Sequence, residues 1–268
     1  MTTLSLAHLT VLDASPTELI EAAAAGGFNA VGLRIMPPFL DDTIMPVVGH
    51  PGLVRDIKAR MAQLGVSILD VEAVWLMPHT DVDALAPVLD LAVELGARHV
   101  LTVGNDPEAG RLTANLSRFG AACQARGLRV MLEFIPYAVI DTLPAAVALL
   151  RNAAPANAGI LVDALHLSRS GAGPADLASF DPALFSYVHL CDAPAAPPAG
   201  LRPEARSGRL LPGEGGLDLQ ALILALPPGT PAAVEAPCAR YASLPVMERA
   251  ELAGAAARRM LAFSRSAA

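Results

Sequence analysis

The sequence predicts a single (β/α)8 barrel that spans residues 1–268. Eight short apolar runs alternate with eight segments of helical periodicity, which is typical of a parallel sheet. Barrels of this kind reach the length of this chain as one unit. An open, doubly wound sheet is the alternative, but no GxGxxG turn follows the first run and no Walker motif occurs.

The predicted strands are short apolar runs bounded by proline, glycine or polar residues. Their β-branched and long aliphatic side chains are typical of strands that are buried on both faces. The runs begin near Leu4, Ala30, Val66, Arg98, Arg129, Ala158, Phe185 and Pro231. Because the strands alternate with helices, we expect them to pair in parallel.

The predicted helices have recognisable ends. Ser15 is an N-cap that is followed by Pro16 at the first helical position and by Glu18 at N3, and this helix closes at Gly26 and Gly27. The other helices are expected over 51–64, 82–95, 108–126, 143–152, 174–179, 217–226 and 246–263. The Pro/Ala-rich stretch 192–209 predicts a long loop after the seventh strand.

Composition excludes several classes of protein. The chain is 53% hydrophobic and 17% charged, so it can bury a large core. Its net charge of −7 and the lack of a basic stripe argue against a nucleic-acid partner. Cys123, Cys191 and Cys238 have no CxxC spacing, which predicts reduced thiols in a cytoplasmic protein. We expect neither a signal peptide nor a membrane span, since no apolar stretch approaches the ~20 residues that a span requires.

Metal-ligand side chains stand at the ends of four successive predicted strands. The runs LRVMLE, AGILVD, FSYVHL and PAAVE carry, in order, Glu133, Asp163, His189 and Glu235. Each residue alone could be a capped strand end or part of an ion pair. In a barrel, however, the carboxyl ends of the strands meet at one mouth. Carboxylates with one imidazole suit Mn²⁺, Mg²⁺, Co²⁺ or Zn²⁺, so we predict one divalent ion bound by these four residues.

Further polar residues are expected around the same mouth as substrate contacts. His8 follows the first strand, Arg34 ends the second, and Glu72 and Trp75 lie near the end of the third. Each has a structural alternative: a satisfied core histidine for His8, a salt bridge between Arg34 and Glu72, and packing under a loop for Trp75.

Two residues lie three positions beyond predicted ligands. His166 follows Asp163 too closely for both to bind one ion from the same strand face, so we expect it to contact a substrate hydroxyl. Asp192 follows His189, and we expect it to accept a hydrogen bond from the ligand histidine, since metal-bound imidazoles need such a partner.

Five motifs carry a family resemblance when they are taken in order. They are LEFIP at Glu133, VDALH over 162–166, VHLCD over 188–192, LLPGEGGLDL over 210–219, and VEAP at Glu235. With AAAAGGFNAVGLR near the amino terminus, they resemble the xylose isomerase-like TIM barrels, in particular the sugar phosphate isomerase/epimerase group, over nearly the whole chain. That group includes ketose 3-epimerases, hydroxypyruvate isomerase, inosose dehydratase, dehydroshikimate dehydratase and type IV AP endonucleases.

The resemblance implies residue roles and also shows departures. It implies that the four strand-end residues bind the metal and that His166 and Arg209 contact substrate. Many members have a glutamate in the second strand where this chain has Gly32, with Arg34 at the strand end, which favours a substrate with an anionic or strongly polar end. Cys191 stands where a lysine or another polar residue is common, which removes one candidate acid or base.

The expected chemistry is proton abstraction next to a carbonyl, with Glu133 and Glu235 as the acid/base pair. Return of the proton to the opposite face gives an epimerase, and return to the neighbouring carbon gives an isomerase. Loss of a β-hydroxyl instead gives a dehydratase, which is the alternative. A non-catalytic, metal-stabilised sugar-binding barrel is the alternative from another class of protein.

The expected partner is a small sugar, polyol or keto acid. No lysine- or glycine-rich phosphate cradle is visible, so an unphosphorylated substrate is favoured. The AP endonuclease branch uses more histidines, which hold three zinc ions. It is disfavoured because this chain has six histidines in total and a negative net charge. The sequence leaves open whether the protein forms a homo-oligomer.

Overall fold

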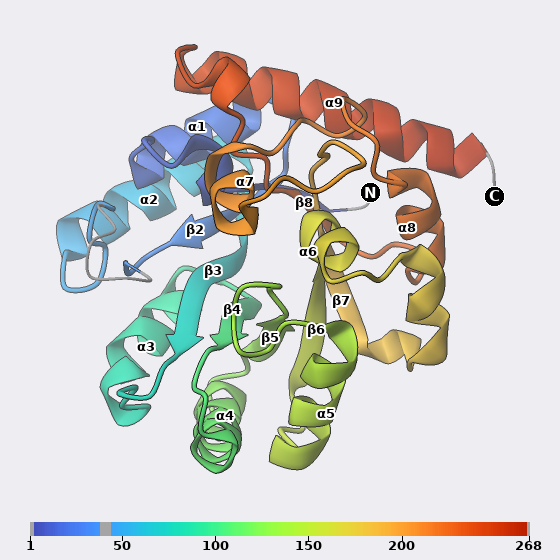
Figure 1. Cartoon of the computed structure of the whole chain (residues 1–268). Coiled ribbons are helices and arrows are strands. Elements are labelled where there is room, and N and C mark those ends of the chain that lie inside the picture. Colours follow the sequence, from blue (N-terminus) through green and yellow to red (C-terminus); the bar gives the residue numbers. More distant parts are fainter. Residues whose placement is uncertain (1–2, 38–43, 267–268) are drawn as a thin grey trace.

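The computed structural model describes residues 3–37 and 44–266. In this part of the chain, eight parallel strands close into a barrel in sequence order, and β1 pairs with β8 to complete the ring (Figure 1). The strands are β1 (Leu4–Ala7), β2 (Ala30–Arg34), β3 (Ser67–Leu76), β4 (His99–Gly104), β5 (Arg129–Glu133), β6 (Ala158–Asp163), β7 (Phe185–Leu190) and β8 (Ala232–Val234). The predicted (β/α)8 barrel is therefore confirmed, and each strand starts within one residue of its predicted start.

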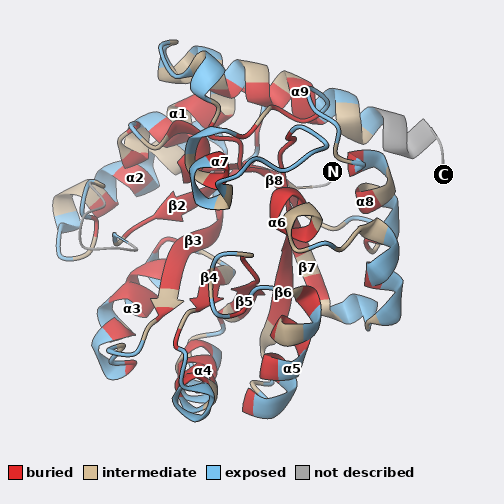
Figure 2. Ribbon diagram, in the orientation of Figure 1, coloured by how far each residue is buried: buried red, intermediate tan, exposed pale blue. Residues whose placement is uncertain are grey.

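The strands are buried on both faces, as their apolar sequences predict (Figure 2). A large apolar core lies between the barrel and its helices and includes Leu6, Leu33 and Val130. A smaller apolar cluster fills the barrel interior and includes Leu101 and Met131. Toward the carboxyl-terminal ends of the strands the interior becomes polar, and this change positions the candidate site.

The helices form a layer outside the strands (Figure 1). They are α1 (Pro16–Ala25), α2 (Pro51–Leu64), α3 (Ala86–Glu94), α4 (Ala109–Gln124), α5 (Leu143–Ala153), α6 (Ala164–Arg169), α7 (Leu201–Ser207), α8 (Leu219–Ala225) and α9 (Val246–Ser266). Short 3₁₀ helices cover η1 (His8–Val11), η2 (Asp83–Leu85), η3 (Pro174–Ser179), η4 (Pro182–Leu184) and η5 (Ala239–Tyr241). The outer faces of the helical layer carry most of the exposed residues (Figure 2).

The helix ends follow the sequence signals. Ser15 and Glu18 form the predicted capping box, in which the backbone N–H of Ser15 donates to Glu18 Oε2 at 2.8 Å and that of Glu18 donates to Ser15 Oγ at 3.3 Å. Gly65 ends α2 with a φ of 69°, a left-handed conformation that glycine adopts without a steric penalty.

Two helices depart from the predicted pattern. The stretch 192–209, expected as a long loop, contains α7, and α6 begins directly after β6. The segment 174–179 is a 3₁₀ helix and not an α-helix. Both α6 and α7 lie on the carboxyl-terminal side of the barrel, where their residues reach the candidate site.

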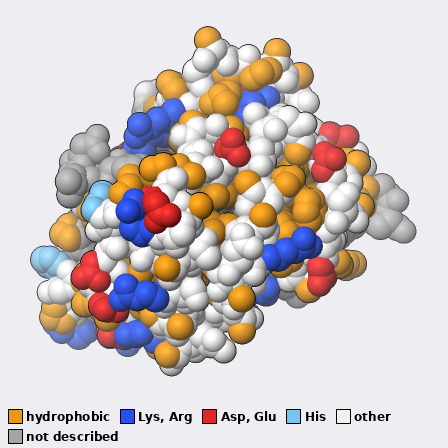
Figure 3. Space-filling model, turned by 60° about the horizontal axis from the view of Figure 1, so that its bottom comes forward, with side chains coloured by type: hydrophobic (Ala, Val, Ile, Leu, Met, Phe, Trp, Pro, Cys, Tyr) orange, Lys and Arg blue, Asp and Glu red, His pale blue; other side chains and the backbone are white. Residues whose placement is uncertain are grey.

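Two further features concern the helices and the surface charges of the described residues. None of the helices within residues 3–37 and 44–266 has both the length and the apolar character needed to cross a bilayer. On the face in Figure 3, acidic and basic side chains are interspersed. That face therefore offers no continuous basic surface for a nucleic-acid backbone.

Candidate metal centre

Four ligand-type side chains meet at the carboxyl-terminal mouth of the barrel. Glu133 ends β5 and Asp163 ends β6. His189 is the penultimate residue of β7, and Glu235 directly follows β8. One potential ligand atom from each side chain lies within 4.8 Å of the others, and all four residues are buried. The strand ends thus converge as predicted, and the metal-binding role of these residues stays a proposal.

The donor set fits a divalent ion. Nδ1 of His189 lies 3.5 Å from Glu235 Oε2 and 3.8 Å from Asp163 Oδ2. This nitrogen and Oε1 of Glu133 are buried, and neither has a hydrogen-bond partner among the described residues. Buried polar atoms of this kind are costly unless a ligand satisfies them. Three carboxylates and one imidazole are suitable ligands for Mn²⁺, Mg²⁺, Co²⁺ or Zn²⁺.

Arg209 is the positive partner of two of these carboxylates. Its Nη1 donates to Asp163 Oδ2 at 2.5 Å, and its Nη2 lies 2.9 Å from Glu235 Oε2. The guanidinium also donates to the carbonyl oxygens of Ala205 and Glu235, so the side chain is held on several sides. Arg209, expected to contact substrate, lines the same cavity as Glu133 and Glu235 but is already paired with Asp163 and Glu235.

Crowded buried charges set the protonation of the site. Burial, together with Glu235 and Asp163, raises the pKa of Glu133 well above its usual range. For Glu235, burial opposes ionisation, but Arg209 and His189 outweigh it and lower the pKa below its usual range. For His189, burial opposes protonation, but the surrounding carboxylates, Glu235 first, raise the pKa to about 10. Without a metal ion, the site therefore holds protons that a divalent ion would displace.

A cavity of about 50 Å³ lies beside the four residues. Five of the predicted rim residues line it: Arg34, Glu72, Trp75, His166 and Arg209. Glu133 and Glu235 line it as well, so both predicted acid/base residues face the space that a substrate would reach.

Arg34 and Glu72 form one wall of this cavity. Arg34 Nε lies 3.8 Å from Glu72 Oε2, which agrees with the predicted charge pair. Within the described part of the chain, Nε and Nη1 of Arg34 and both oxygens of Glu72 are buried without a hydrogen-bond partner. Burial, and then Asp70 and Glu235, raise the pKa of Glu72 to about 8. Arg34 therefore presents guanidinium donors that a ligand can satisfy.

His166 enters the cavity from the first turn of α6. Asp163 is the N-cap of this helix and accepts the backbone N–H of His166 at 3.0 Å through Oδ1. The His166 ring meets the ring of Tyr137 edge-on at 5.9 Å between centroids. Burial lowers the pKa of His166 to about 4, so the ring is neutral at physiological pH and can donate or accept one hydrogen bond. This placement is compatible with the predicted contact to a substrate hydroxyl.

Two predicted site residues have other partners. His8 lies 3.0 Å from the carbonyl oxygen of Ala14 through Nε2 and accepts the backbone N–H of Arg34 at Nδ1, as its structural alternative anticipated. Asp192 accepts backbone N–H groups from Ala193, Gly213 and Leu217. The expected hydrogen bond from His189 to Asp192 is absent, because within the described residues both ring nitrogens of His189 are unpartnered. Asp192 instead fixes the PGEG loop.

Some residues near the site carried little signal in the sequence. Tyr137 lies in the loop after β5, and Arg206 lies in the unpredicted α7. Asp70 could have been found, because it stands two residues before Glu72 on the same strand and so faces the same side. Its side chain is fully buried in the barrel interior.

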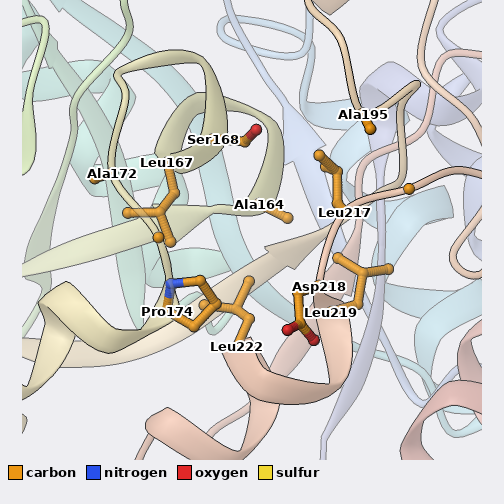
Figure 4. A pocket seen from close by; sticks show the side chains of 12 residues that line it. Ala164, Leu167, Ser168, Ala172, Pro174, Ala195, Leu217, Asp218, Leu219 and Leu222 are labelled. Carbon is orange, nitrogen blue, oxygen red and sulfur yellow. The ribbon is translucent and has the colours of Figure 1, made fainter.

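Other cavities differ in their relation to the metal centre. A cavity of about 150 Å³ and one of about 410 Å³ flank the site, and Arg206 lines both of them as well as the central cavity. A further cavity of about 140 Å³ lies between α6 and α8 (Figure 4). Its lining is largely apolar and shares no residue with the central cavity, so it has no direct part in the site.

The fold and the site define a (β/α)8 barrel with a candidate divalent metal centre at its carboxyl-terminal mouth. The family model for the xylose isomerase-like TIM barrel matches residues 20–262. The chain therefore belongs to the xylose isomerase-like TIM barrel family.

One curated relative and two solved structures illustrate the range of similar proteins. A 3-dehydroshikimate dehydratase of Pseudomonas aeruginosa is 27% identical over 224 residues, which cover 77% of this chain and 33% of the relative. This chain thus matches about a third of that longer protein. The IOLI protein with a bound zinc atom is 18% identical, with a TM-score of 0.79 over 98% of this chain and 99% of the other. D-allulose 3-epimerase from Methylomonas sp., in complex with D-allulose, is 17% identical, with a TM-score of 0.70 over 97% and 96%.

Proposed function

We propose that this protein is a divalent-metal-dependent isomerase or epimerase that removes a proton next to the carbonyl of a sugar, keto-polyol or keto acid. The observation that carries the proposal is the convergence of Glu133, Asp163, His189 and Glu235 within 4.8 Å at the mouth of the barrel. The resemblance of the fold to an epimerase and to a zinc-containing neighbour supports it.

The four residues would hold one divalent ion, with substrate or water completing the shell. The bound ion would supply Lewis-acid polarisation of a substrate carbonyl, which acidifies the neighbouring C–H. The chain itself orients the donor set. Arg209 fixes one carboxylate oxygen of Asp163 and one of Glu235, and the backbone N–H of His166 fixes the other oxygen of Asp163.

Glu133 and Glu235 are the acid/base pair of the proposal. They project from β5 and from the end of β8, so they reach the cavity from different strands. A carboxylate at one side of the substrate can take the proton from carbon, and a carboxyl group at the other side can return one. Return of the proton to the opposite face would invert the configuration at that carbon. Return of the proton to the neighbouring carbon would move the carbonyl group.

Dehydration of a hydroxylated keto acid is the second candidate. Two observations favour it: the similarity to a 3-dehydroshikimate dehydratase and the unsatisfied buried donors of Arg34 beside the ligands. Arginine pairs well with a carboxylate because its planar fork can donate two parallel hydrogen bonds. In this reaction the same proton is removed, and a β-hydroxyl leaves as water after taking a proton from an acid such as Glu133, whose raised pKa favours the protonated form.

Deuterium exchange tests the shared first step. The metal-loaded protein would be incubated in D₂O with ketoses, keto-polyols and cyclic hydroxylated keto acids, and NMR would follow deuterium at the carbon next to the carbonyl. We expect exchange with at least one substrate and a loss of about 10²–10⁴ in rate for Glu133→Gln and Glu235→Gln. Glutamine keeps an oxygen for the metal but is not basic, and metal content is measured for each variant.

The outcomes separate the candidates. Exchange together with inversion of the carbon next to the carbonyl supports the epimerase, and exchange together with movement of the carbonyl group supports the isomerase. Loss of the β-hydroxyl with a new alkene absorbance supports the dehydratase. Turnover without exchange would remove the proposed base role from both glutamates. Binding of these compounds without exchange or turnover would support the alternative that the protein is a non-catalytic sugar-binding barrel.

A further inference from the structure

His189 has one ring nitrogen that the four-residue metal centre does not use. Nδ1 is the nitrogen near Asp163 and Glu235, at 3.8 and 3.5 Å. The two nitrogens of an imidazole point in different directions, so Nε2 points away from those carboxylates. Nε2 is buried, and no described residue gives it a hydrogen bond.

Metal binding at Nδ1 would fix what Nε2 must do. An imidazole that binds a metal through one nitrogen carries its proton on the other, and that N–H needs an acceptor. A buried donor without an acceptor is destabilising. The acceptor also fixes the plane of the ring, so it decides whether Nδ1 points at the metal.

Asp70 lies on the interior side of His189 with a free acceptor atom. A carboxylate oxygen of Asp70 lies within 4.8 Å of a ring nitrogen of His189, close enough for a hydrogen bond after a small ring rotation or for one bridging water. Oδ1 of Asp70 is buried and has no partner among the described residues. Gly32 leaves room for this carboxylate, since a Cβ there would lie 2.7 Å from Asp70 Oδ1.

Tyr187 holds the other end of this carboxylate. Its hydroxyl donates to Asp70 Oδ2 at 2.7 Å across the barrel interior. Tyr187 stands two residues before His189 on β7, so both side chains face the interior, and their rings meet edge-on at 5.6 Å between centroids. The hydroxyl therefore fixes Asp70 with Oδ1 as the oxygen left for another donor.

Other carboxylates are less suited to this role. Glu72 also has an oxygen within 4.8 Å of a ring nitrogen of His189, but it pairs with Arg34 and lines the substrate cavity, whereas Asp70 is not among the residues that line this cavity. Both oxygens of Asp192 already accept backbone N–H groups, from Ala193, Gly213 and Leu217. Asp70 is thus the carboxylate that combines reach to His189 with a fixing partner in Tyr187 and an open oxygen.

We propose that Asp70, held by Tyr187, accepts the Nε2–H of His189 and thereby aims Nδ1 at the metal. Asp70 is a positioning residue in this scheme, because it touches neither substrate nor metal. The inference rests on the metal centre of the proposed function but not on the reaction that the centre performs. Carboxylates that orient metal-binding histidines typically change metal affinity by about 10–100-fold.

Metal affinity is the first test. Zn²⁺ dissociation constants would be measured by competition with a chromophoric chelator, with no substrate present. We expect Asp70→Asn to weaken Zn²⁺ binding by about 10–100-fold, and Tyr187→Phe to weaken it less because the carboxylate remains. Asp90→Asn is the matched control, since Asp90 is an exposed aspartate that pairs with Arg126 far from the site. Thermal unfolding of each variant reports whether it folds.

The hydrogen bond itself is read by NMR of protein with ¹⁵N-labelled histidine. In Zn²⁺-loaded wild type we expect His189 to carry its proton on Nε2, with a downfield and slowly exchanging signal that shifts upfield in Asp70→Asn. This readout does not depend on variant stability, because wild type alone shows the tautomer. A proton on Nδ1, or equal Zn²⁺ affinity and an unchanged signal in Asp70→Asn, would overturn the inference. Failure of wild type to bind Zn²⁺ would overturn it together with the metal centre.

Discussion

At the scale of single residues, the side chains at the strand ends could be predicted from the sequence, but the residues that hydrogen-bond to them could not. Glu133, Asp163 and His189 each end an apolar run, and parallel strands in a barrel bring such ends together. The acceptor for a histidine depends on which strands face each other across the interior. Asp192 was expected for this role from its nearness in sequence, yet Asp70 lies within reach only because β3 stands opposite β7 in the closed barrel.

His166 is expected to contribute to activity without binding the metal. We expect His166→Ala to retain its metal and to lose about two- to tenfold in kcat/KM, because a hydrogen bond to substrate contributes about 0.5–1.5 kcal/mol. The backbone N–H that caps α6 remains in this variant, so Asp163 keeps one of its partners. Steady-state kinetics on a substrate found by exchange, with metal content measured in parallel, checks the prediction.

The control for His166 is His79→Ala, because His79 is exposed in the loop after β3. This variant should match wild type in both activity and metal content. Loss of the metal from His166→Ala would instead make His166 a ligand and change the assignment of the four-residue centre.

At the scale of elements, local sequence patterns predict the long helices and the strands, but they do not predict α6 and α7. Asp163 ends β6 and also caps α6, so one residue carries both roles and no loop separates the two elements. The α7 sequence is short and lies in a Pro/Ala-rich stretch. A buried ion pair holds it in place, since Arg169 in α6 and Glu204 in α7 approach within 2.7 Å with little exposure. A contact between distant residues cannot be seen in local patterns.

The pair between Arg169 and Glu204 gives the prediction at this scale. We expect Glu204→Ala to lower the free energy of unfolding by about 3–5 kcal/mol, because removal of one partner leaves a buried charge unpaired. KM should rise as well, because α7 carries Arg206 and leads into Arg209 at the site. Thermal or urea unfolding and steady-state kinetics measure the two effects.

A surface pair is the comparison for this prediction. Asp83 and Arg118 approach within 2.9 Å, but Asp83 is 84% exposed, so Asp83→Ala should change stability by less than about 1 kcal/mol. Equal effects of Asp83→Ala and Glu204→Ala would show that the buried pair does not hold α7.

At the scale of the whole molecule, the pH dependence of stability should contain a contribution from His8. Burial lowers its pKa to about 4 in the folded chain, against 6.5 for a free histidine. Between pH 4 and 6.5 the unfolded chain therefore binds more protons at this position. The contribution of His8 is full above pH 6.5 and is lost as the pH falls toward 4, with a slope of up to about 1.4 kcal/mol per pH unit.

Urea unfolding of wild type and His8→Gln, both in the presence of a chelator, isolates this contribution. Buried carboxyl groups with raised pKa values, such as Glu72, change stability in the opposite direction in the same range, so the difference between the two proteins is the quantity to follow. The difference should shrink as the pH is lowered from 6.5 to 4. A constant difference would show that His8 is not held neutral in the folded state.

The whole fold could be predicted more fully than the reaction. Alternating strands and helices determine a barrel almost without regard to which substrate it binds, and the strand-end ligands indicate a metal. The outcome after proton removal depends on small differences in where an acid such as Glu133 and a hydrogen-bonding group such as His166 meet the substrate. Isomerisation, epimerisation and dehydration share the same first step, so the ligand residues do not distinguish them.

The metal content of the protein is the most direct test of whether Glu133, Asp163, His189 and Glu235 bind a divalent ion. Protein loaded with Mn²⁺ or Zn²⁺ and then dialysed would be examined by elemental analysis, together with Glu133→Ala, His189→Ala and the exposed control His79→Ala. We predict about one divalent ion per chain in wild type and in the control, with a large loss in the Glu133 and His189 variants. Equal metal content in all four proteins, or none in wild type, would contradict it.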